Sequence, residues 1–242
     1  MSTVAIIDWG IGGFALYNEL RTDGAKRVIY FSDAGFTPYG KVPKNELKQR
    51  LEKVIFFVRS LGAEQISVAC NAASAAMRLD EHSLKLIPGF GIKQAVAGNY
   101  KHVGVIGGEL AINSGLYANP LREHGIVVTE QIAQPLSAEI EAGRLNGKVE
   151  KLLDTILLPL TKVQALILGC THYSAVAERI QQQLPNCKLI DPSVNMGRWI
   201  KQNWPIDDGK LECYTTGDKD TMKCSALLAF GVSIDEIQRI DL

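Results

Sequence analysis

Two cysteines lie in similar surroundings and could act together. Cys70 ends an apolar run at residues 66–69, and Cys170 ends a second run at residues 166–169. Each run is typical of a buried strand, and the small and polar residues after each cysteine indicate the start of a helix. A helix N-terminus carries partial positive charge and free N–H groups, which favour a thiolate. We therefore expect a lowered pKa for Cys70, and the thiolate is the reactive form of cysteine.

A pair of thiols suits the inversion of a stereocentre, because that reaction needs a base on one face of a carbon atom and an acid on the other. The α-hydrogen of an amino acid is a very weak acid, so the site must stabilise a developing carbanion with N–H groups and polar side chains. Asp8 follows an apolar run at residues 4–7 and is a candidate for tuning the thiols. Further candidates, which could bind a carboxylate or assist proton transfer, follow the cysteines: Asn71, Ser74, Thr171 and His172.

Each of these residues also has a purely structural interpretation. A lone cysteine is most often buried and inert, a histidine at a helix start often caps the helix, and Asp8 could be an N-cap or a turn residue. The equivalent positions of the two cysteines favour the chemical interpretation. The turn at residues 8–13 contains three glycines without the G-x-G-x-x-G spacing, so it is weak evidence for dinucleotide binding.

The other three cysteines carry no chemical motif. We expect Cys187 to precede a strand and Cys213 to lie within one, and we assign no role to Cys224. None of the five cysteines falls in a C-x-x-C pair, which argues against a zinc site or a redox motif. The sequence therefore predicts no metal site.

Several apolar runs predict the elements that position the candidate residues. Runs typical of buried strands occur at residues 4–7, 28–31, 66–69, 103–106, 126–128, 165–168 and 188–190. Helical spacing of apolar residues predicts helices at residues 14–20 and 44–61, the second ended by Gly62. This alternation indicates parallel sheets with helices on both faces.

A weak internal repeat relates the two cysteine motifs. Residues 4–7 have a counterpart 99 positions later at 103–106, and residues 66–70 have one 100 positions later at 166–170. Ligands of open α/β sheets bind at the carboxyl ends of the strands, where both cysteines lie. We therefore predict an α/β fold with two pseudo-symmetric parallel-sheet lobes and the active site in the cleft between them.

Composition limits the classes of partner. The 242 residues are 46% hydrophobic and 21% charged, as in an ordinary globular protein, and the formal net charge is zero. Overall charge thus gives no case for binding nucleic acid or an anionic membrane. Residues 1–8 are too short and too strand-like for a signal peptide, and no apolar stretch is long enough to span a membrane. We expect a cytoplasmic protein with reduced thiols.

Six segments together resemble the glutamate racemase family, within the wider aspartate/glutamate racemase superfamily. The resemblance extends over nearly the whole chain, and residues 168–173 match the family's L-G-C-T-H-Y in full. The other segments are residues 7–13 (D-S-G-[VI]-G-G in the family), 30–33 with 38–40 (Y-x-D…P-Y-G), 69–75 (A-C-N-T-A-S-A), Glu141 with Gly143 (L-V-E-x-G) and 214–218 (V-T-G-D).

The resemblance implies roles for named residues. Cys70 and Cys170 would be the catalytic acid/bases, with Cys70 serving the D-isomer and Cys170 the L-isomer. Asp8, Glu141 and His172 would tune the thiols or assist proton transfer. Residues at the substrate would be Trp9, Pro38, Tyr39, Gly40, Asn71, Ala72, Thr171 and His172.

The resemblance also implies the organisation and setting of the protein. Residues 1–96 and 206–242 would form the first lobe, with Cys70, and residues 97–205 the second, with Cys170. The substrate would be a small amino acid, and neither pyridoxal phosphate nor a metal would be needed. The product D-glutamate would supply peptidoglycan, and a homodimer is expected.

Three positions depart from the family pattern. A serine is replaced by Trp9, and two threonines by Ala72 and Ala111. Loss of hydroxyl groups from a pocket can redirect its specificity. Trp9 either shortens the pocket, which favours aspartate, or points away from it. The alternatives to glutamate racemisation are therefore racemisation of aspartate or another small amino acid, and a ligand-binding protein with weak catalysis on a racemase scaffold.

Overall fold

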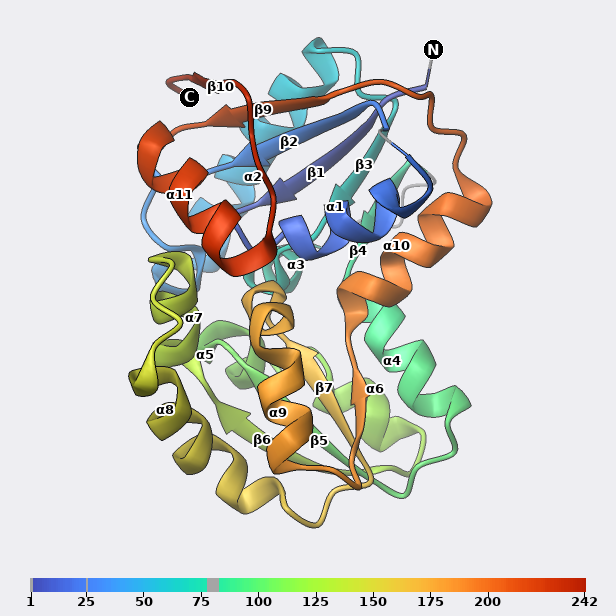
Figure 1. The fold of residues 1–242 in the computed structure, drawn as a ribbon. Coiled ribbons are helices and arrows are strands. Elements are labelled where there is room, and N and C mark those ends of the chain that lie inside the picture. The colour runs from blue at the N-terminus through green and yellow to red at the C-terminus, as the bar shows by residue number, and fades with distance from the viewer. Residues whose placement is uncertain (1, 25, 78–82) are drawn as a thin grey trace.

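Two parallel β-sheets, each covered by helices on both faces, form the two lobes of the molecule (Figure 1). The computed structural model describes residues 2–24, 26–77 and 83–242. The first sheet has the strand order β10-β9-β2-β1-β3-β4, and the second has the order β6-β5-β7-β8. Neighbouring strands within each sheet are all parallel.

The strands of the first sheet are β1 Val4–Asp8, β2 Val28–Ser32, β3 Gln65–Val68, β4 Leu84–Leu86, β9 Leu211–Thr215 and β10 Ile237–Arg239. Those of the second are β5 His102–Gly107, β6 Val127–Ile132, β7 Ala165–Gly169 and β8 Lys188–Ile190. The α-helices are α1 Phe14–Leu20, α2 Lys44–Ser60, α3 Asn71–Ala76, α4 Pro88–Ala97, α5 Glu109–Asn113, α6 Ala118–Glu123, α7 Gln134–Glu141, α8 Gly147–Leu157, α9 Ala177–Gln183, α10 Pro192–Asn203 and α11 Lys219–Phe230. Short 3-10 helices are η1 Arg21–Asp23, η2 Tyr39–Lys41, η3 Leu158–Leu160 and η4 Thr171–Val176.

The predicted fold class and internal repeat are confirmed by the sheet topology. The order β2-β1-β3-β4 in the first lobe equals β6-β5-β7-β8 in the second, and Cys70 and Cys170 follow the equivalent strands β3 and β7. β9 and β10 extend the first sheet beyond β2, so the end of the chain returns to the first lobe.

One predicted strand differs from the structure. The sequence predicts a buried strand at residues 126–128, but β6 runs over Val127–Ile132 and is partly exposed along its length. The reason is its position, because β6 is an edge strand with β5 as its neighbour in the sheet. The short strands β4 and β10 carry too few residues to give a sequence signal.

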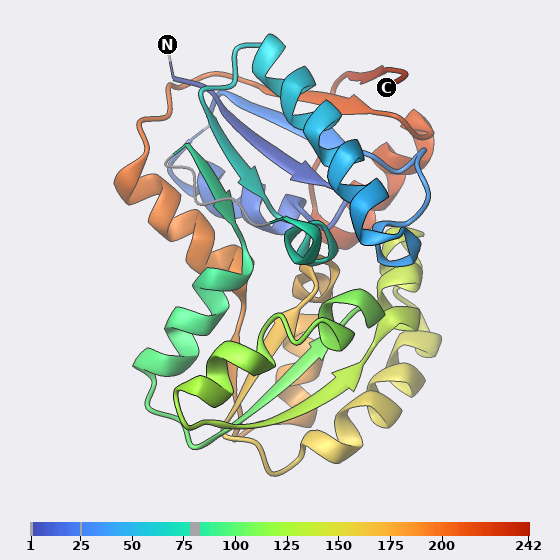
Figure 2. The same cartoon turned by 180° about the vertical axis from the view of Figure 1, so that it is seen from behind.

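Burial of apolar side chains on both faces holds each sheet. All five residues of β1 and all five of β7 are buried, as in sheets with helices on both sides. Figure 2 shows α2, in light blue, lying across the face of the first sheet opposite α1. Residues Leu47, Leu51, Val54 and Val58 of α2 are buried, and Gly62 follows the helix with φ +92°, a conformation that favours glycine.

Helices α4 and α10 pack against one another where the lobes join. α4 contacts β7 and β8 of the second sheet, whereas α10 packs mainly on α1 of the first. In α10, Trp199 lies with its ring centroid 5.6 Å from that of Phe90 in α4. The lobe boundaries at residues 96/97 and 205/206 remain a prediction. α4 lies almost wholly before the first boundary but contacts the second sheet, and α10 lies before the second boundary but packs on a helix of the first lobe.

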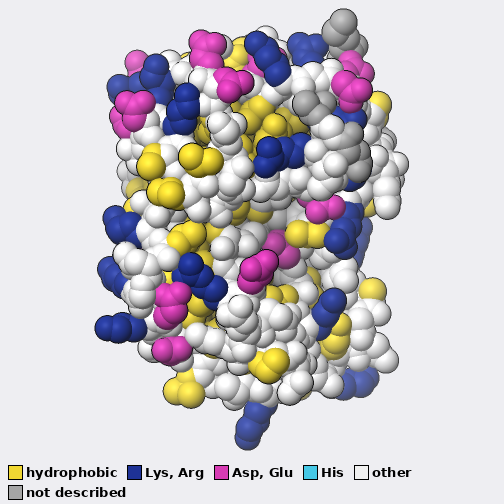
Figure 3. Space-filling view, in the orientation of Figure 1, with side chains coloured by type: hydrophobic (Ala, Val, Ile, Leu, Met, Phe, Trp, Pro, Cys, Tyr) yellow, Lys and Arg dark blue, Asp and Glu magenta, His cyan; other side chains and the backbone are white. Residues whose placement is uncertain are grey.

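The molecular surface shows no concentration of one charge on the face in Figure 3, where Lys and Arg are interspersed with Asp and Glu. Among the described residues, no helix is long and apolar enough to cross a membrane.

A buried ion pair fixes the loop after β2. Asp33 is fully buried and accepts hydrogen bonds from Arg50 Nε (2.8 Å) and Arg50 Nη2 (2.6 Å). It also accepts from the Tyr39 hydroxyl (2.8 Å) and from Thr216 Oγ1 (2.9 Å). This network joins α2, η2 and the segment after β9, so the carboxylate holds three parts of the first lobe together.

Replacing Arg50 should therefore destabilise the protein strongly. In Arg50→Ala the buried Asp33 carboxylate loses its countercharge, and we expect the free energy of unfolding to fall by about 3–5 kcal/mol, as for a broken buried pair. Urea denaturation measures it. Lys48→Ala on the same helix removes one member of an exposed pair with Glu52 and should change stability by less than about 1 kcal/mol. Equal effects of the two substitutions would contradict the role given to Arg50.

Candidate functional site

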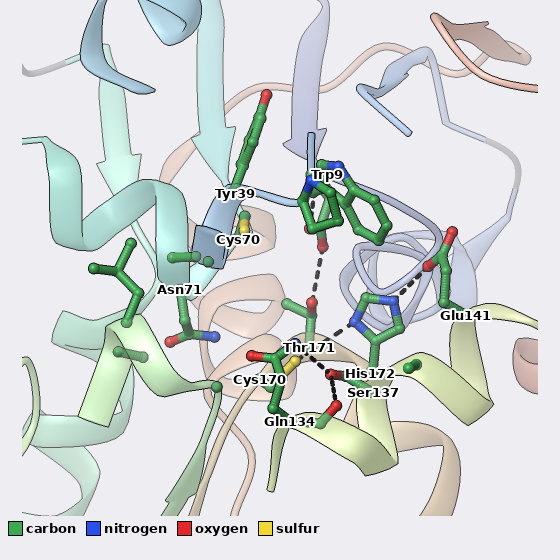
Figure 4. A pocket seen from close by; sticks show the side chains of 18 of the residues that line it. Trp9, Tyr39, Cys70, Asn71, Gln134, Ser137, Glu141, Cys170, Thr171 and His172 are labelled. Carbon is green, nitrogen blue, oxygen red and sulfur yellow. Dashed lines mark hydrogen bonds and ion pairs between the residues drawn. The ribbon is translucent and has the colours of Figure 1, made fainter. Parts of the chain in front are cut away.

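A cavity of about 520 Å³ lies between the lobes at the carboxyl ends of both sheets. Its size is typical of a small-molecule site. The structure brings all twelve residues predicted for the site to its wall: Asp8, Trp9, Pro38, Tyr39, Gly40, Cys70, Asn71, Ala72, Glu141, Cys170, Thr171 and His172. Figure 4 shows the two cysteine side chains on opposite sides of this space.

Cys70 lies at the N-cap position of α3, two residues after the end of β3, and is buried. The expected lowering of its pKa is wrong, since burial raises the pKa of this thiol well above its ordinary value, with a further contribution from the charge of Asp8. Hydrogen bonds from the backbone N–H groups of Ala72 and Ala73 oppose that shift without cancelling it. Desolvation therefore outweighs the helix terminus, and Cys70 is a thiol at neutral pH.

Cys170 belongs to a chain of three polar groups. Its Sγ lies 3.5 Å from His172 Nδ1, and His172 Nε2 lies 2.5 Å from Glu141 Oε2. Burial by itself lowers the pKa of His172, but Cys170 and Glu141 together raise this pKa well above its ordinary value. A protonated His172 can donate one N–H to Cys170 Sγ and one to Glu141 Oε2. The helix predicted after Cys170 is the 3-10 helix η4.

Asp8 joins the two lobes at the end of β1. Its Oδ2 accepts a hydrogen bond from Thr171 Oγ1 (2.8 Å), and its Oδ1 accepts one from the Trp9 N–H (2.7 Å). Burial raises the pKa of Asp8, while His172, Thr171 and Trp9 act in the opposite direction. Asp8 does not cap α1, where Gly13 holds the N-cap position. The carboxylate therefore faces the site and the second lobe.

The glycines after Asp8 permit close approach between the lobes. A Cβ at Gly10 would collide with the Glu141 carboxylate, and a Cβ at Gly12 would collide with Thr171 Oγ1. The Ile11 N–H between them donates to Glu141 Oε2 (2.9 Å). The close approach of second-lobe side chains to this turn explains Gly10 and Gly12, and no bound nucleotide is needed to explain them.

Trp9 and Tyr39 line the cavity, and their polar side-chain atoms bond elsewhere. Trp9 Nε1 donates to the Phe36 carbonyl (3.0 Å), and the Tyr39 hydroxyl donates to Asp33 (2.8 Å). Figure 4 shows the Tyr39 hydroxyl pointing away from the cysteines. Trp9 lines the cavity, which is against the alternative that it points away from it. Ala111 also lines it.

Asn71 offers a donor to the cavity. Its Oδ1 accepts a hydrogen bond from the Tyr117 hydroxyl (2.6 Å), whereas its buried Nδ2 has no partner among the described residues. Figure 4 shows Nδ2 directed into the space between the cysteines. Ser74, considered as a possible ligand for a carboxylate, instead donates to the Cys70 carbonyl (2.9 Å) within α3.

Gln134 and Ser137 line the cavity and were not identified from the sequence. Gln134 Oε1 accepts from the Glu109 N–H (3.2 Å), and Gln134 Nε2 donates to Ser137 Oγ (3.2 Å). Both residues share one face of α7 with Glu141, being seven and four positions before it. That spacing is the signal that would have indicated them once α7 was recognised as a helix.

The other cysteines lie outside the cavity. Burial raises the pKa of Cys187 to about 11 and that of Cys213 to about 12, while Cys224 is exposed on α11. Cys187 directly precedes β8 and Cys213 lies in β9, as predicted. Within residues 2–24, 26–77 and 83–242, no group of three or more His, Cys, Asp or Glu is arranged to hold a metal ion.

Comparison with known proteins agrees with the motifs. The Asp/Glu/hydantoin racemase family model matches residues 18–194. The chain is 33% identical to a glutamate racemase of Carboxydothermus hydrogenoformans, over 99% of this chain and 96% of that protein. Glutamate racemase from Thermus thermophilus in complex with β-chloro-D-alanine has a similar structure, with a TM-score of 0.88 at 23% identity over 100% of this chain and 97% of that one.

A second solved structure is similarly close in fold. Glutamate racemase from Francisella tularensis in complex with D-glutamate gives a TM-score of 0.86 at 23% identity, over 99% of this chain and 97% of that one. At these identities the structural likenesses establish the fold, and the family follows from the sequence matches.

The chain of contacts from Glu141 to Cys170 predicts a measurable change in His172. In Glu141→Gln the pKa of His172 should fall, because the lost carboxylate favours the imidazolium. The imidazolium would then lose its proton at a lower pH than in the wild type. NMR titration of labelled histidine follows it, with His172→Asn to assign the signal. Glu139→Gln, on the same helix but paired with Arg144 and Lys148, is the control and should leave the titration unchanged. An unaltered His172 titration in Glu141→Gln would contradict this geometry.

Proposed function

The chain belongs to the Asp/Glu/hydantoin racemase family, and on that premise we propose that it interconverts L- and D-glutamate without a cofactor. One observation carries the proposal: two cysteines from equivalent strand ends, Cys70 and Cys170, line opposite sides of one cavity. An acid and a base on opposite faces of a carbon atom are what inversion at Cα requires. The proposal fits the names of the curated relatives, which are glutamate racemases.

The proposed reaction moves two protons. In the L-to-D direction, the Cys170 thiolate takes the α-proton, and the electron pair of the broken C–H bond remains on the substrate as a carbanion delocalised into its carboxylate. The Cys70 thiol then gives its proton to the opposite face of Cα. The products are D-glutamate, a Cys170 thiol and a Cys70 thiolate, and the D-to-L direction starts from that state.

The electrostatics of the site suit this alternation. The imidazolium of His172 favours negative charge on Cys170, while burial and Asp8 keep Cys70 protonated. Negative charge on Cys170 is itself one cause of the raised pKa of Cys70. When Cys170 takes up the substrate proton, that cause disappears, and Cys70 releases its own proton more readily.

The α-carboxylate of the substrate would accept a hydrogen bond from Asn71 Nδ2. This buried amide nitrogen has no protein partner in the described part of the chain. A buried donor left unpaired costs about 1–3 kcal/mol, which a carboxylate in the cavity would recover. Bonds of this kind also stabilise the carbanion, whose charge spreads onto the carboxylate oxygens.

The side-chain carboxylate would bind at Gln134, since the Ser137 hydroxyl already donates to the Gln134 carbonyl (2.8 Å). Gln134 Nε2 carries two hydrogens, of which one is directed to Ser137 Oγ, and the bond from the Glu109 N–H to Oε1 fixes which end of the amide donates. Trp9, Ala72 and Ala111 supply no hydroxyl. Gln134 Nε2 on α7 is therefore the neutral donor proposed for the side-chain carboxylate.

Three further statements belong to this proposal and rest on the resemblance of the sequence motifs. The D-glutamate would serve peptidoglycan of the cell wall, the protein would work in the cytoplasm, and it would form a homodimer.

Exchange of the α-hydrogen in D₂O tests the reaction directly. Proton NMR of L- and D-glutamate with the wild-type protein should show loss of the α-proton signal, and circular dichroism should show loss of optical activity. Cys70→Ser and Cys170→Ser should each slow racemisation by about 100-fold or more. Cys224→Ser, at an exposed position, is the control. Wild-type rates in either active-site variant would exclude the two-thiol mechanism, and exchange with aspartate alone would replace the substrate.

Gln134→Glu tests the assignment of the side-chain carboxylate. The new carboxylate keeps the shape of the side chain and repels a second carboxylate, so kcat/KM for glutamate should fall by about tenfold or more. The loss with glutamine should be smaller, because its side-chain amide can donate to the carboxylate oxygens that this substitution introduces. Gln131→Glu, outside the cavity, is the matched control. Equal losses with glutamate and glutamine would place the substrate side chain elsewhere.

A further inference from the structure

Tyr117 is a buried residue of the second lobe that contacts the surroundings of both cysteines. It lies at the N-cap position of α6 and is 1% exposed. Its ring fits between two glycines: a Cβ at Gly91 would lie 3.1 Å from Tyr117 Cε1, and one at Gly169 would lie 3.3 Å from Cε2. Gly169 directly precedes Cys170, so the ring packs against the backbone that presents this thiol.

The hydroxyl of Tyr117 reaches the other lobe. It donates a 2.6 Å hydrogen bond to Oδ1 of Asn71, the residue that directly follows Cys70. The two residues are 46 positions apart in the chain. One side chain thus spans from the backbone next to Cys170 to the side chain next to Cys70.

This bond holds the Oδ1 end of the Asn71 amide at Tyr117. With Oδ1 held by the hydroxyl, Nδ2 and its hydrogens are directed to the space between the cysteines (Figure 4). A rotated amide would present its oxygen instead, which repels a carboxylate. Burial, together with the charges of Asp191 and Cys170, raises the pKa of Tyr117 well above its ordinary value, so the hydroxyl keeps its proton and can donate it to Oδ1.

We propose that Tyr117 is a positioning residue, which orients the Asn71 amide as a donor to the substrate carboxylate and ties the Cys70 segment to the second lobe. The inference rests on the proposed function, since it assigns Asn71 to the substrate. Tyr117 does not itself line the cavity and is given no part in proton transfer.

Tyr117→Phe keeps the ring and removes the hydroxyl. We expect kcat/KM for glutamate to fall by about tenfold, mainly through a higher KM, because the carboxylate is bound in both the ground state and the transition state. The double-mutant cycle with Asn71→Ala separates positioning from packing. If Tyr117 acts through Asn71, adding Tyr117→Phe to Asn71→Ala should cause little further loss. Tyr17→Phe, in a buried tyrosine of the first-lobe core, is the control and should retain wild-type kinetics.

A second readout does not depend on turnover. The side-chain amide signals of Asn71, identified by their absence in Asn71→Ala, should shift in the ¹H–¹⁵N spectrum of Tyr117→Phe and exchange faster with solvent. Unchanged signals, or equal losses from Tyr117→Phe with and without Asn71, would overturn the inference. A wild-type protein that exchanges no amino acid would instead refute the proposed function, while the amide signals would still decide whether Tyr117 holds Asn71.

Discussion

The hydrogen bond from Thr171 Oγ1 to Asp8 Oδ2 joins the carboxyl end of β1 to the segment that follows β7, and the geometry of the site depends on it. Asp8 ends β1 in the first lobe, and Thr171 follows Cys170 in the second. Both groups are buried, so losing either partner would leave a polar atom unpaired. The hydrogen bond from the Ile11 N–H to Glu141 Oε2 also connects the two lobes. The separation of the two thiols is therefore set by contacts between lobes and not by either sheet alone, and the glycines at 10 and 12 are required because these contacts are so close.

Charge around the thiols follows from this arrangement. Asp8, Glu141 and Cys170 surround one buried basic group, the imidazole of His172, whose pKa Cys170 and Glu141 raise. A second thiolate at Cys70 would add negative charge to a region without a further countercharge among the groups that act on it. In the proposed mechanism no more than one of the two thiols is therefore deprotonated at a time. Two equivalent helix starts would suggest similar environments for the two cysteines. The environments differ because burial raises the pKa of Cys70, whereas His172 stands beside Cys170.

The sequence predicted the features that are repeated or periodic. Equivalent apolar runs predicted the two lobes, and the residues that end them, Cys70 and Cys170, were predicted to meet in a cleft. The predicted direction of the Cys70 pKa was wrong because burial depends on the packing of segments distant in the chain, such as Ile7 and Tyr214, which local sequence does not describe. Tyr117 gave no sequence signal for a similar reason, since its partner Asn71 lies in another lobe. The Asp33–Arg50 pair, seventeen positions apart, likewise can be recognised only in the folded structure, where α2 packs over the sheet.

The three residues that stand where the family has a serine or a threonine all lie at the cavity, so the loss of their hydroxyl groups changes its chemistry. Trp9, Ala72 and Ala111 all line it, and the indole N–H of Trp9 is bound to a backbone carbonyl. A neutral donor, Gln134 Nε2, stands instead on α7, where the Ser137 hydroxyl donates to the Gln134 carbonyl. The thiols and their tuning groups are held by contacts that bridge the lobes, so they constrain one another. The side chains of Trp9 and Gln134 bond to Phe36, Glu109 and Ser137 and not to a thiol, so they are under no such mutual constraint. Such a division lets the side-chain end of the cavity vary in chemistry while the geometry for proton transfer at Cα stays fixed.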